Sequence, residues 1–300
     1  MKKDILSIKV LTKTEILQLI NRGLEFKKMG KNPFQKPLTG YVLGLLFDKA
    51  STRTRVSFEV AMLKLGGSTI FMSSKETQLS RNESIEDTAR VLSRYLDCLA
   101  IRTYAQKTVE LMAEYASIPI INALTDMYHP CQVLSDIMTV KEKKGKIDEL
   151  KIAWIGDGNN VANSWINLAR ILGFELIVSC PEKYKPSELI TNSNNIKFIE
   201  DPKEAVKNVD VINTDVWVSM GQEKEKEQKI KALKKYQVNK ELLSIAKPDV
   251  MIMHCLPAHR GQEITDDVID GPNSVVFDQA ENKLYLHEAL LEMLLVGKQV

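Results

Sequence analysis

The sequence lacks the features on which disulfide-stapled, zinc-binding and membrane-spanning proteins depend. It contains only four cysteines, and no two of them form a CxxC pair that could seed a zinc site or a redox motif. Its longest strongly apolar run, residues 41–47, is far shorter than the roughly 20 residues of a membrane-spanning helix. Charged residues interrupt positions 1–13, which therefore do not resemble a secretory signal. We expect reduced thiols, no bound metal, no membrane partner and a cytoplasmic location.

An excess of charge of one sign is also missing. Forty-one Lys and Arg residues stand against 39 Asp and Glu residues, so the formal net charge of +2 is too balanced for a protein that coats nucleic acid. Hydrophobic residues make up 44% and charged residues 27% of the chain, as in ordinary globular proteins. A length of 300 residues then predicts about two domains, each large enough to bury its own core.

Short apolar runs that alternate with helical patterns predict the fold of the first half. Thr12 and Glu15 form a capping box that opens an N-terminal helix ending near Gly30. The expected strands are 41–47, 68–72, 98–101 and 118–122. The expected helices are near 55–65, 84–96 and 107–116, with another from about 133. Such alternation is typical of βαβ units, in which crossover helices join parallel strands.

The second half repeats this alternation after a charged connection at 141–151. Its expected strands are 151–155, 174–179, 209–214, 250–254 and 274–277. The lysine-rich segment 223–235 is expected to be a solvated helix face without a chemical role. A strongly apolar last helix is expected over 281–296.

The predicted fold class is therefore α/β, with two doubly wound parallel-sheet domains and an interdomain cleft. Residues 1–140 would form the first domain and residues 141–280 the second. The C-terminal helix, at about 281–300, would pack back on the first domain.

One strand-to-helix turn carries an unusual density of hydrogen-bond donors. The run Ser51-Thr52-Arg53-Thr54-Arg55 follows the apolar strand 41–47 and begins a helical pattern. Unpaired backbone N–H groups and the positive end of the helix dipole favour an anion there, and hydroxyls and a guanidinium add directed donors. A helix cap alone would need only one of these residues. The run therefore favours a phosphate site.

Three motifs in order give the sequence a family resemblance. They are STRTR at 51–55, HPCQ at 129–132 and HCLP at 254–257, each at the carboxyl end of a predicted strand. In this order and separation, the chain resembles the ornithine carbamoyltransferases, of the aspartate/ornithine carbamoyltransferase superfamily, along nearly its whole length. The resemblance implies transfer of the carbamoyl group of carbamoyl phosphate to the δ-amine of L-ornithine, which gives L-citrulline and phosphate in arginine metabolism, without a cofactor.

By this resemblance the first domain binds carbamoyl phosphate. Ser51, Thr52, Arg53 and Thr54 would hold the phosphate, and Arg102 would reach both the phosphate and the carbonyl oxygen. His129 and Gln132 would contact the carbamoyl group, with His129 donating to the carbonyl oxygen as it gains negative charge. From the residues alone, Arg102 could equally be a solvated charge at a strand end, and His129 a loop residue with its hydrogen bonds satisfied.

The resemblance also implies a homotrimer, or a multiple of trimers, whose subunits share active sites. Gln78 matches the position that reaches carbamoyl phosphate in a neighbouring subunit. Ser80 and Asn82 stand in the same loop where glycines are expected. Lys283 stands where the family has an arginine that contacts carbamoyl phosphate, and lysine keeps the charge but loses bidentate geometry.

The segment Gly156-Asp157-Gly158-Asn159-Asn160 opens the second domain and allows two interpretations. It follows a strand and begins a helix, as a dinucleotide-binding turn does, but Val161 stands where GxGxxG needs its third glycine. An NAD-dependent oxidoreductase is therefore disfavoured. By resemblance, Asn160 would hold the backbone of ornithine.

The DxxxSMG pattern at 215–221 matches the family's ornithine motif. By resemblance, Asp215, Ser219 and the backbone of Met220 bind the α-amino-acid end of ornithine. An acidic group suits an α-ammonium, whereas aspartate as acceptor would need cationic partners for its second carboxylate.

The attacking δ-amine must lose its proton. An alkylamine with a pKa of about 10.4 is only ~10⁻³ neutral near pH 7.4, a deficit of about 4 kcal/mol. A carboxylate beside this nitrogen would enlarge the deficit, so we expect Asp215 at the α end and the weaker acceptor Cys255 near the δ-nitrogen. By resemblance, Cys255 and the Leu256 carbonyl lie at the amine and complete the carbamoyl phosphate site.

Two other functions stay open at this point. Cys255 follows His254 directly, but adjacent strand residues point to opposite faces, which argues against a covalent cysteine–histidine pair. A two-domain protein that binds both small molecules without turnover is the remaining alternative, and it leaves Cys255 without a purpose.

Overall fold

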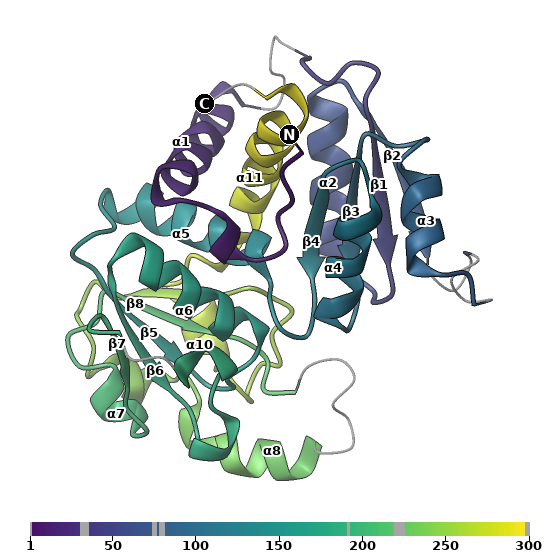
Figure 1. Ribbon diagram of the computed structural model, residues 1–300. Helices are drawn as coiled ribbons and strands as arrows, with labels where there is room; N and C mark the ends of the chain where they lie inside the picture. Colours follow the sequence, from purple (N-terminus) through teal and green to yellow (C-terminus); the bar gives the residue numbers. More distant parts are fainter. Residues whose placement is uncertain are drawn as a thin grey trace. The chain divides into compact units, whose positions relative to one another are not determined.

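The computed structural model describes residues 2–30, 36–73, 77, 82–190, 193–218 and 226–297. The chain divides into two compact units, of which unit 1 comprises Met1–Met138 and Glu281–Val300 and unit 2 comprises Thr139–Ala280. The chain passes between the units within helices α5 (Pro130–Lys144) and α11 (Val276–Val296) (Figure 1). Among the described residues, no helix combines the length and the apolar character that a bilayer crossing requires.

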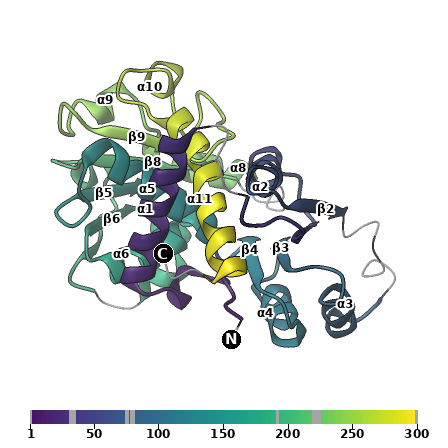
Figure 2. The same ribbon diagram turned by 90° about the horizontal axis from the view of Figure 1, so that it is seen from above.

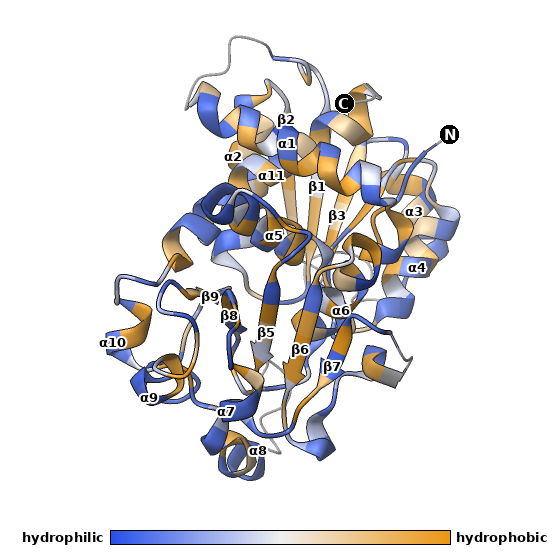
Figure 3. Cartoon of the chain, turned by 90° about the vertical axis from the view of Figure 1, so that its left-hand side faces the viewer, coloured by the Kyte–Doolittle hydropathy of each residue, from blue (hydrophilic) through white to orange (hydrophobic). Residues whose placement is uncertain are grey.

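Unit 1 is built on a parallel sheet with the strand order β2-β1-β3-β4. Its strands are β1 (Val42–Phe47), β2 (Ser68–Ser73), β3 (Cys98–Arg102) and β4 (Ile120–Leu124). The central strands β1 and β3 are buried on both faces and consist mainly of aliphatic residues, which Figure 3 shows in the hydrophobic colour. The edge strand β2 is partly exposed.

Helices cover both faces of this sheet, which makes unit 1 doubly wound. The helices of unit 1 that precede α5 are η1 (Ile8–Val10), α1 (Lys13–Met29), α2 (Thr52–Lys64), α3 (Ile85–Leu92) and α4 (Gln106–Tyr115). Figures 1 and 2 show α2 on one face and α3 and α4 on the other. The expected capping box of Thr12 and Glu15 begins α1. Helix α1 runs beside α11, where Arg22 Nε donates to Glu292 Oε2 at 2.6 Å.

Unit 2 is built on a second parallel sheet, with the strand order β7-β6-β5-β8-β9. Its strands are β5 (Lys151–Ile155), β6 (Glu175–Ser179), β7 (Ile196–Phe198), β8 (Val211–Thr214) and β9 (Met251–His254). Strand order reverses at β5, because β6 and β7 lie on one side of it and β8 and β9 on the other. The predicted α/β class, with a parallel sheet in each half of the chain, is confirmed.

The helices of unit 2 bury an apolar core against the sheet. They are α6 (Asn160–Leu172), η4 (Glu182–Tyr184), η5 (Ser187–Ile190), α7 (Pro202–Ala205), α8 (Lys226–Leu233), η7 (Lys234–Tyr236), α9 (Lys240–Leu243) and α10 (Asp266–Ile269). Side chains from β5, β8 and β9 pack with residues of α7, α8, α9 and α10 in one cluster that includes Ile155, Ile212 and Ile252.

The structure differs from the sequence-based expectations in three elements: one expected strand is wrong, one helix reaches into the expected connection, and one short strand was not expected. The segment 274–277 is not a strand, because only Ser274 forms an isolated bridge, to Ile252, and helix α11 already begins at Val276. Helix α5 runs on to Lys144 into the segment that was expected to be a connection. The short edge strand β7 was not predicted, since half-exposed residues in three positions give no clear alternation.

Candidate active site

The first group of candidate residues lies at the carboxyl ends of the unit 1 strands. Phe47, the last residue of β1, pairs with Ser73 of β2 and with Arg102 of β3, and Arg102 pairs in turn with Leu124 of β4. Ligands of α/β proteins bind at this edge of the sheet. The STRTR run follows β1, Arg102 ends β3, and His129 follows β4 by a short loop, so the predicted residues share one edge.

The STRTR run begins helix α2. Ser51 is the N-cap residue, with an extended φ of −159°, and its side chain makes no capping hydrogen bond. Thr54 is buried. Arg55 Nε donates to Glu59 Oε1 at 2.9 Å, and its guanidinium lies 3.6 Å from the centre of the Phe71 ring. Helix capping therefore does not account for Ser51, and the second arginine of the run is engaged on the surface of its own helix.

Buried polar side chains from three elements form the interior part of the unit 1 site. Lys283 Nζ of α11 donates to Gln132 Oε1 of α5 at 2.8 Å, and Gln132 Nε2 donates to Asp136 Oδ1 at 2.8 Å. Arg102 and His129 are buried like these three residues. The lysine that replaces the expected arginine thus reaches the predicted Gln132, as a single donor and not as a fork.

His129 is held in its neutral form. Burial of the imidazole lowers its pKa well below the usual value, and the nearby positive charges of Lys283 and Arg102 lower the pKa further. A neutral imidazole keeps one N–H donor at neutral pH and stays neutral in mildly acidic solution. His129 can therefore donate a hydrogen bond to an oxygen without contributing a positive charge of its own.

Several predicted site residues lie outside the described part of the chain. Gln78 and Ser80 of the expected shared loop are among them, as are Ser219 and Met220 of the DxxxSMG pattern. Asn82 is described and has a positive φ of 68°. Asparagine tolerates this left-handed backbone better than most residues, so it can occupy a position where glycine is expected.

The second group of candidate residues lies at the carboxyl edge of the unit 2 sheet. Thr214 of β8 pairs with His254 of β9, so Asp215 and Cys255 are the first residues beyond two neighbouring strands. The Cys255 thiol Sγ lies 3.0 Å from Asp215 Oδ1 and donates to it. Asn159 Nδ2 donates to Asp215 Oδ2 at 2.7 Å. The carboxylate of Asp215 is thus held by a donor on each oxygen.

The glycine-rich turn positions Asn159 and Asn160. The Asn159 side chain caps helix α6 by accepting from the backbone N–H groups of Val161 and Ala162, at 2.9 and 3.2 Å. Asn160, the predicted ornithine ligand, is the first residue of α6 and is partly buried. Sequence reasoning missed the contact of Asn159 with Asp215, although its position just before the helix was a capping signal.

Gly158 is required by the protein's own packing. A Cβ atom at this position would lie 2.2 Å from the Tyr184 carbonyl oxygen, and the Gly158 N–H donates to that oxygen at 3.0 Å. In a dinucleotide-binding turn the corresponding space admits a pyrophosphate. Here the space is filled by the chain itself, which further disfavours the dinucleotide interpretation.

A buried histidine fixes the HCLP turn. The Leu256 backbone N–H donates to His254 Nδ1 at 2.9 Å, so this nitrogen carries no proton and Nε2–H donates to Glu263 Oε1 at 3.1 Å. His254 and Glu263 are both fully buried. Leu256 has a positive φ of 55° and precedes a cis proline peptide, Leu256–Pro257. The backbone that carries Cys255 and the Leu256 carbonyl is therefore held by a defined histidine tautomer.

The same residues contain a possible metal-ligand set. Asp215, His254 and Cys255 each have one potential ligand atom, and these atoms lie within 4.8 Å of one another. A metal would have to displace existing hydrogen bonds, because both nitrogens of His254 are engaged and the Cys255 thiol donates to Asp215. The arrangement is better described as a hydrogen-bonded network than as an open coordination site.

The lysine-rich helix contributes a buried charge to this region. Lys229 Nζ of α8 lies 2.7 Å from Asp157 Oδ2, and each side chain is only 5% exposed. The expectation that segment 223–235 presents only a solvated face is wrong for Lys229. The sequence signal was weak, because a single lysine among many gives no sign that it faces inward.

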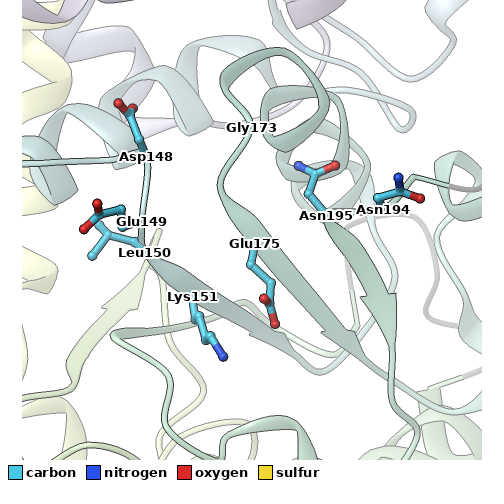
Figure 4. Close-up of a pocket in the computed structure, with 8 residues that line it drawn as sticks. All are labelled: Asp148, Glu149, Leu150, Lys151, Gly173, Glu175, Asn194 and Asn195. Atoms are coloured by element: carbon cyan, nitrogen blue, oxygen red, sulfur yellow. The ribbon is translucent and has the colours of Figure 1, made fainter.

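Unit 2 also has a pocket at the opposite edge of its sheet (Figure 4). Its volume is about 260 Å³, and it is lined by Asp148, Glu149, Leu150, Lys151, Gly173, Glu175, Asn194 and Asn195. These residues precede or begin β5, β6 and β7, so the pocket lies at the amino ends of the strands. It contains none of the candidate residues.

Comparison with known proteins decides the family. The aspartate/ornithine carbamoyltransferase carbamoyl-P binding domain matches residues 3–142, and the Asp/Orn binding domain of the same family matches residues 148–294. The chain belongs to the aspartate/ornithine carbamoyltransferase family. The STRTR and HPCQ motifs fall in the part of the chain that matches the carbamoyl-P binding domain, and the HCLP motif falls in the part that matches the Asp/Orn binding domain.

Individual members of the family are similar over almost their full length. The ornithine carbamoyltransferase of Desulfotalea psychrophila is 52% identical over 95% of this chain and 96% of its own. That of Syntrophus aciditrophicus is 50% identical over 98% of this chain and 100% of its own. The solved structure of ornithine carbamoyltransferase from Pyrococcus furiosus matches with a TM-score of 0.94 and 48% identity, over 99% of this chain and 98% of that chain.

Proposed function

We propose that this protein is an ornithine carbamoyltransferase, which transfers the carbamoyl group of carbamoyl phosphate to the δ-amine of L-ornithine and releases L-citrulline and phosphate. The observation that carries the proposal is the contact between Asp215 and Cys255 at the edge of the unit 2 sheet. Asp215 suits an α-ammonium and the thiol suits an amine, and the hydrogen bonds that Asp215 accepts from Cys255 and Asn159 offset its negative charge near the δ-amine. The names of the similar proteins support the same reaction.

Unit 1 supplies the groups for carbamoyl phosphate. Ser51, Thr52, Arg53 and Thr54 bind the phosphate at the start of helix α2, where backbone N–H groups and the helix dipole favour an anion. Arg102 and Lys283 add positive charge, and neutral His129 donates to the carbonyl oxygen. These groups stabilise the negative charge that develops on the carbonyl oxygen and on the leaving phosphate.

Unit 2 supplies the groups for ornithine. Asp215 and Asn160 bind the α-amino-acid end together with Ser219 and Met220, and Cys255 and the Leu256 carbonyl accept hydrogen bonds at the δ-amine. The neutral amine attacks the carbonyl carbon, a C–N bond forms, and the bond from carbon to the phosphate oxygen breaks. The proton that the amine loses passes to the departing phosphate, which leaves as a trianion and becomes hydrogen phosphate, so that atoms and charge balance.

A comparison of acceptors tests the reaction. We expect purified protein with carbamoyl phosphate to form ureido product with L-ornithine, and little or none with L-aspartate, putrescine or N-acetylornithine. The physical reason is that Asp215 repels the second carboxylate of aspartate and meets a free α-ammonium, which N-acetylornithine lacks. Putrescine keeps that ammonium but lacks the α-carboxylate of an amino acid. A colorimetric ureido assay measures this. Activity with aspartate or N-acetylornithine but not with ornithine would remove the proposed role of Asp215, and activity with putrescine alone would contradict an amino-acid acceptor.

We also propose that the protein forms a homotrimer, or a multiple of trimers, in the cytoplasm, and acts in arginine metabolism. Exposed apolar side chains on α2, which form an apolar patch on one face of the helix, and others on the two faces of the edge strand β2 support self-association, because exposed apolar surface and a strand at the edge of a sheet each favour a partner. They are Val56, Leu63, Ile70 and Phe71, with Leu63 70% exposed. The segment that contains Gln78 follows β2 directly.

Light scattering tests the assembly. We expect a mass of at least three times the 33.9 kDa of one chain, and a smaller mass for Leu63→Glu, which places a charge in the apolar patch. Lys64→Glu is unsuitable as a control because Lys64 pairs with buried Glu288, so Glu59→Gln on the same helix serves instead. A wild-type mass equal to one chain would contradict the trimer.

A further inference from the structure

The buried ion pair of Lys229 and Asp157 lies next to the proposed acceptor residues and has no role in the reaction as described so far. Asp157 belongs to the same turn as Asn159, which donates to Asp215 at 2.7 Å. Lys229 Nζ lies 2.7 Å from Asp157 Oδ2. Two contacts therefore connect this one turn, the first to Asp215 and the second to helix α8.

The charges of this group are coupled to one another. Burial raises the pKa of Asp157 to about 6, Lys229 opposes the rise, and the negative charge of Asp215 adds to it. Asp215 is thus close enough for its charge to be felt at Asp157. A buried carboxylate without a positive partner would be strongly disfavoured, so Lys229 is the group that permits Asp157 to be charged in this position.

We propose that Lys229 sets the net charge of the acceptor site: by neutralising Asp157, it leaves Asp215 as the single net negative charge that meets the α-ammonium of the amino-acid substrate. This inference rests on the proposed function, since it assigns a role in binding ornithine. Lys229 is a positioning residue and does not itself touch the substrate. With Asp157, Asp215 and Lys229 all charged, the group carries one negative charge, which matches one ammonium.

The alternative role for the pair is to attach helix α8 to the turn. Tyr184, whose carbonyl oxygen packs against Gly158, lies on the same side, with its ring centre 5.5 Å from Lys229 Nζ. If the pair only attaches the helix, loss of either partner should weaken ornithine binding equally, and loss of both partners should not restore it. A pair that balances charge behaves differently, and this difference is measurable.

The decisive variant is Asp157→Asn, which keeps the shape of the side chain and leaves the Lys229 charge unbalanced. The group of Asp215 and Lys229 is then neutral, so we expect the KM for ornithine to rise about tenfold or more. The KM for carbamoyl phosphate should stay within about twofold of wild type. L-norvaline keeps the α-amino-acid end and lacks the δ-amine, so its inhibition constant should rise by the same factor as the ornithine KM.

The double variant Asp157→Asn with Lys229→Met restores one negative charge, and we expect the ornithine KM to return to within about threefold of wild type. The matched control is the exposed pair of Lys240 and Asp267 in the same unit, 3.2 Å apart, whose replacement by Met and Asn should change neither constant. Thermal melting of each variant separates loss of folding from loss of binding. If Asp157→Asn does not fold, the double variant, which leaves no unbalanced charge, carries the test.

The proposal is overturned if Asp157→Asn keeps the wild-type ornithine KM, or if the double variant binds ornithine as poorly as the single one. A rise in the ornithine KM without a rise in the norvaline constant would place the defect at the δ-amine and would also overturn it. Failure of the proposed function has another signature, namely wild-type protein that forms no citrulline. Calorimetric titration with norvaline then still measures whether the charge balance controls binding of an α-ammonium.

Discussion

Replacing Arg53 with alanine is expected to lower kcat/KM for carbamoyl phosphate by about 10²–10³-fold, a loss that corresponds to about 3–4 kcal/mol of transition-state stabilisation. Arg53 is the second residue of helix α2, where the first-turn N–H groups already favour an anion. In the proposed phosphate site its guanidinium would add a charged donor pair, which stabilises the leaving phosphate most as the bond to carbon breaks. Steady-state kinetics with carbamoyl phosphate as the varied substrate measure the effect.

The same helix provides the control for Arg53. Arg55→Ala removes an identical charge, but Arg55 is engaged with Glu59 and with the Phe71 ring, so we expect less than a threefold change in kcat/KM. Product inhibition gives a second readout, since the inhibition constant of inorganic phosphate should rise with Arg53→Ala and not with Arg55→Ala. Unchanged kinetics in Arg53→Ala would remove this residue from the phosphate site.

The arrangement of the sheets could be predicted because the sequence signal for buried parallel strands is local. The apolar runs at 41–47 and 151–155 become β1 and β5, and the polar residues that follow each run come to lie at the carboxyl edge. Parallel pairing then brings motifs that are far apart in the sequence to one edge. Parallel pairing alone therefore predicts that Ser51, Arg102 and His129 share the carboxyl edge of the unit 1 sheet, even though no individual contact can be predicted.

The side-chain partners at this edge could not be predicted in the same way. Lys229 and Asp157 are 72 positions apart, and the lysine lies in a segment where most residues are exposed. No periodicity marks a single inward lysine, because helix α8 has only a weak apolar face. The contact of Asn159 with Asp215 spans 56 positions and depends equally on how the two chain segments are packed.

The wrong strand at 274–277 shows where local patterns mislead. Ser274 does bridge to Ile252 of β9, so the start of the segment behaves as an edge strand would. The chain then turns into α11 at Val276, and the buried Gln279 accepts a hydrogen bond from the His254 backbone N–H at 2.9 Å. Two adjacent valines favour a strand by propensity, but this buried contact requires a helix, and tertiary structure prevails.

Replacing Cys255 with serine tests the chemistry at the amine. The thiol donates to Asp215 Oδ1 at 3.0 Å, while Asn159 holds the other oxygen, so the sulfur position is well defined. A serine hydroxyl keeps this hydrogen bond but is a smaller group, and its oxygen is a stronger acceptor that favours the protonated amine over the reactive neutral amine. We expect kcat to fall by about 10–10²-fold with the fold and thermal melting retained, and Cys255→Ala to fall further because it also leaves Asp215 without one donor.

The pH dependence separates this role from simple packing. A thiol ionises with a pKa of about 8.5 in its unperturbed form, whereas a serine hydroxyl does not ionise in the accessible range. In wild type, loss of the Cys255 thiol proton would place a thiolate against the Asp215 carboxylate and remove the hydrogen bond between them, which would weaken the site. The alkaline part of the kcat profile should therefore change in Cys255→Ser.

Cys98→Ala, which removes a buried thiol from the core of unit 1, should lower stability and leave the profile intact. Superimposable profiles for wild type and Cys255→Ser would show that the thiol does not act at the amine.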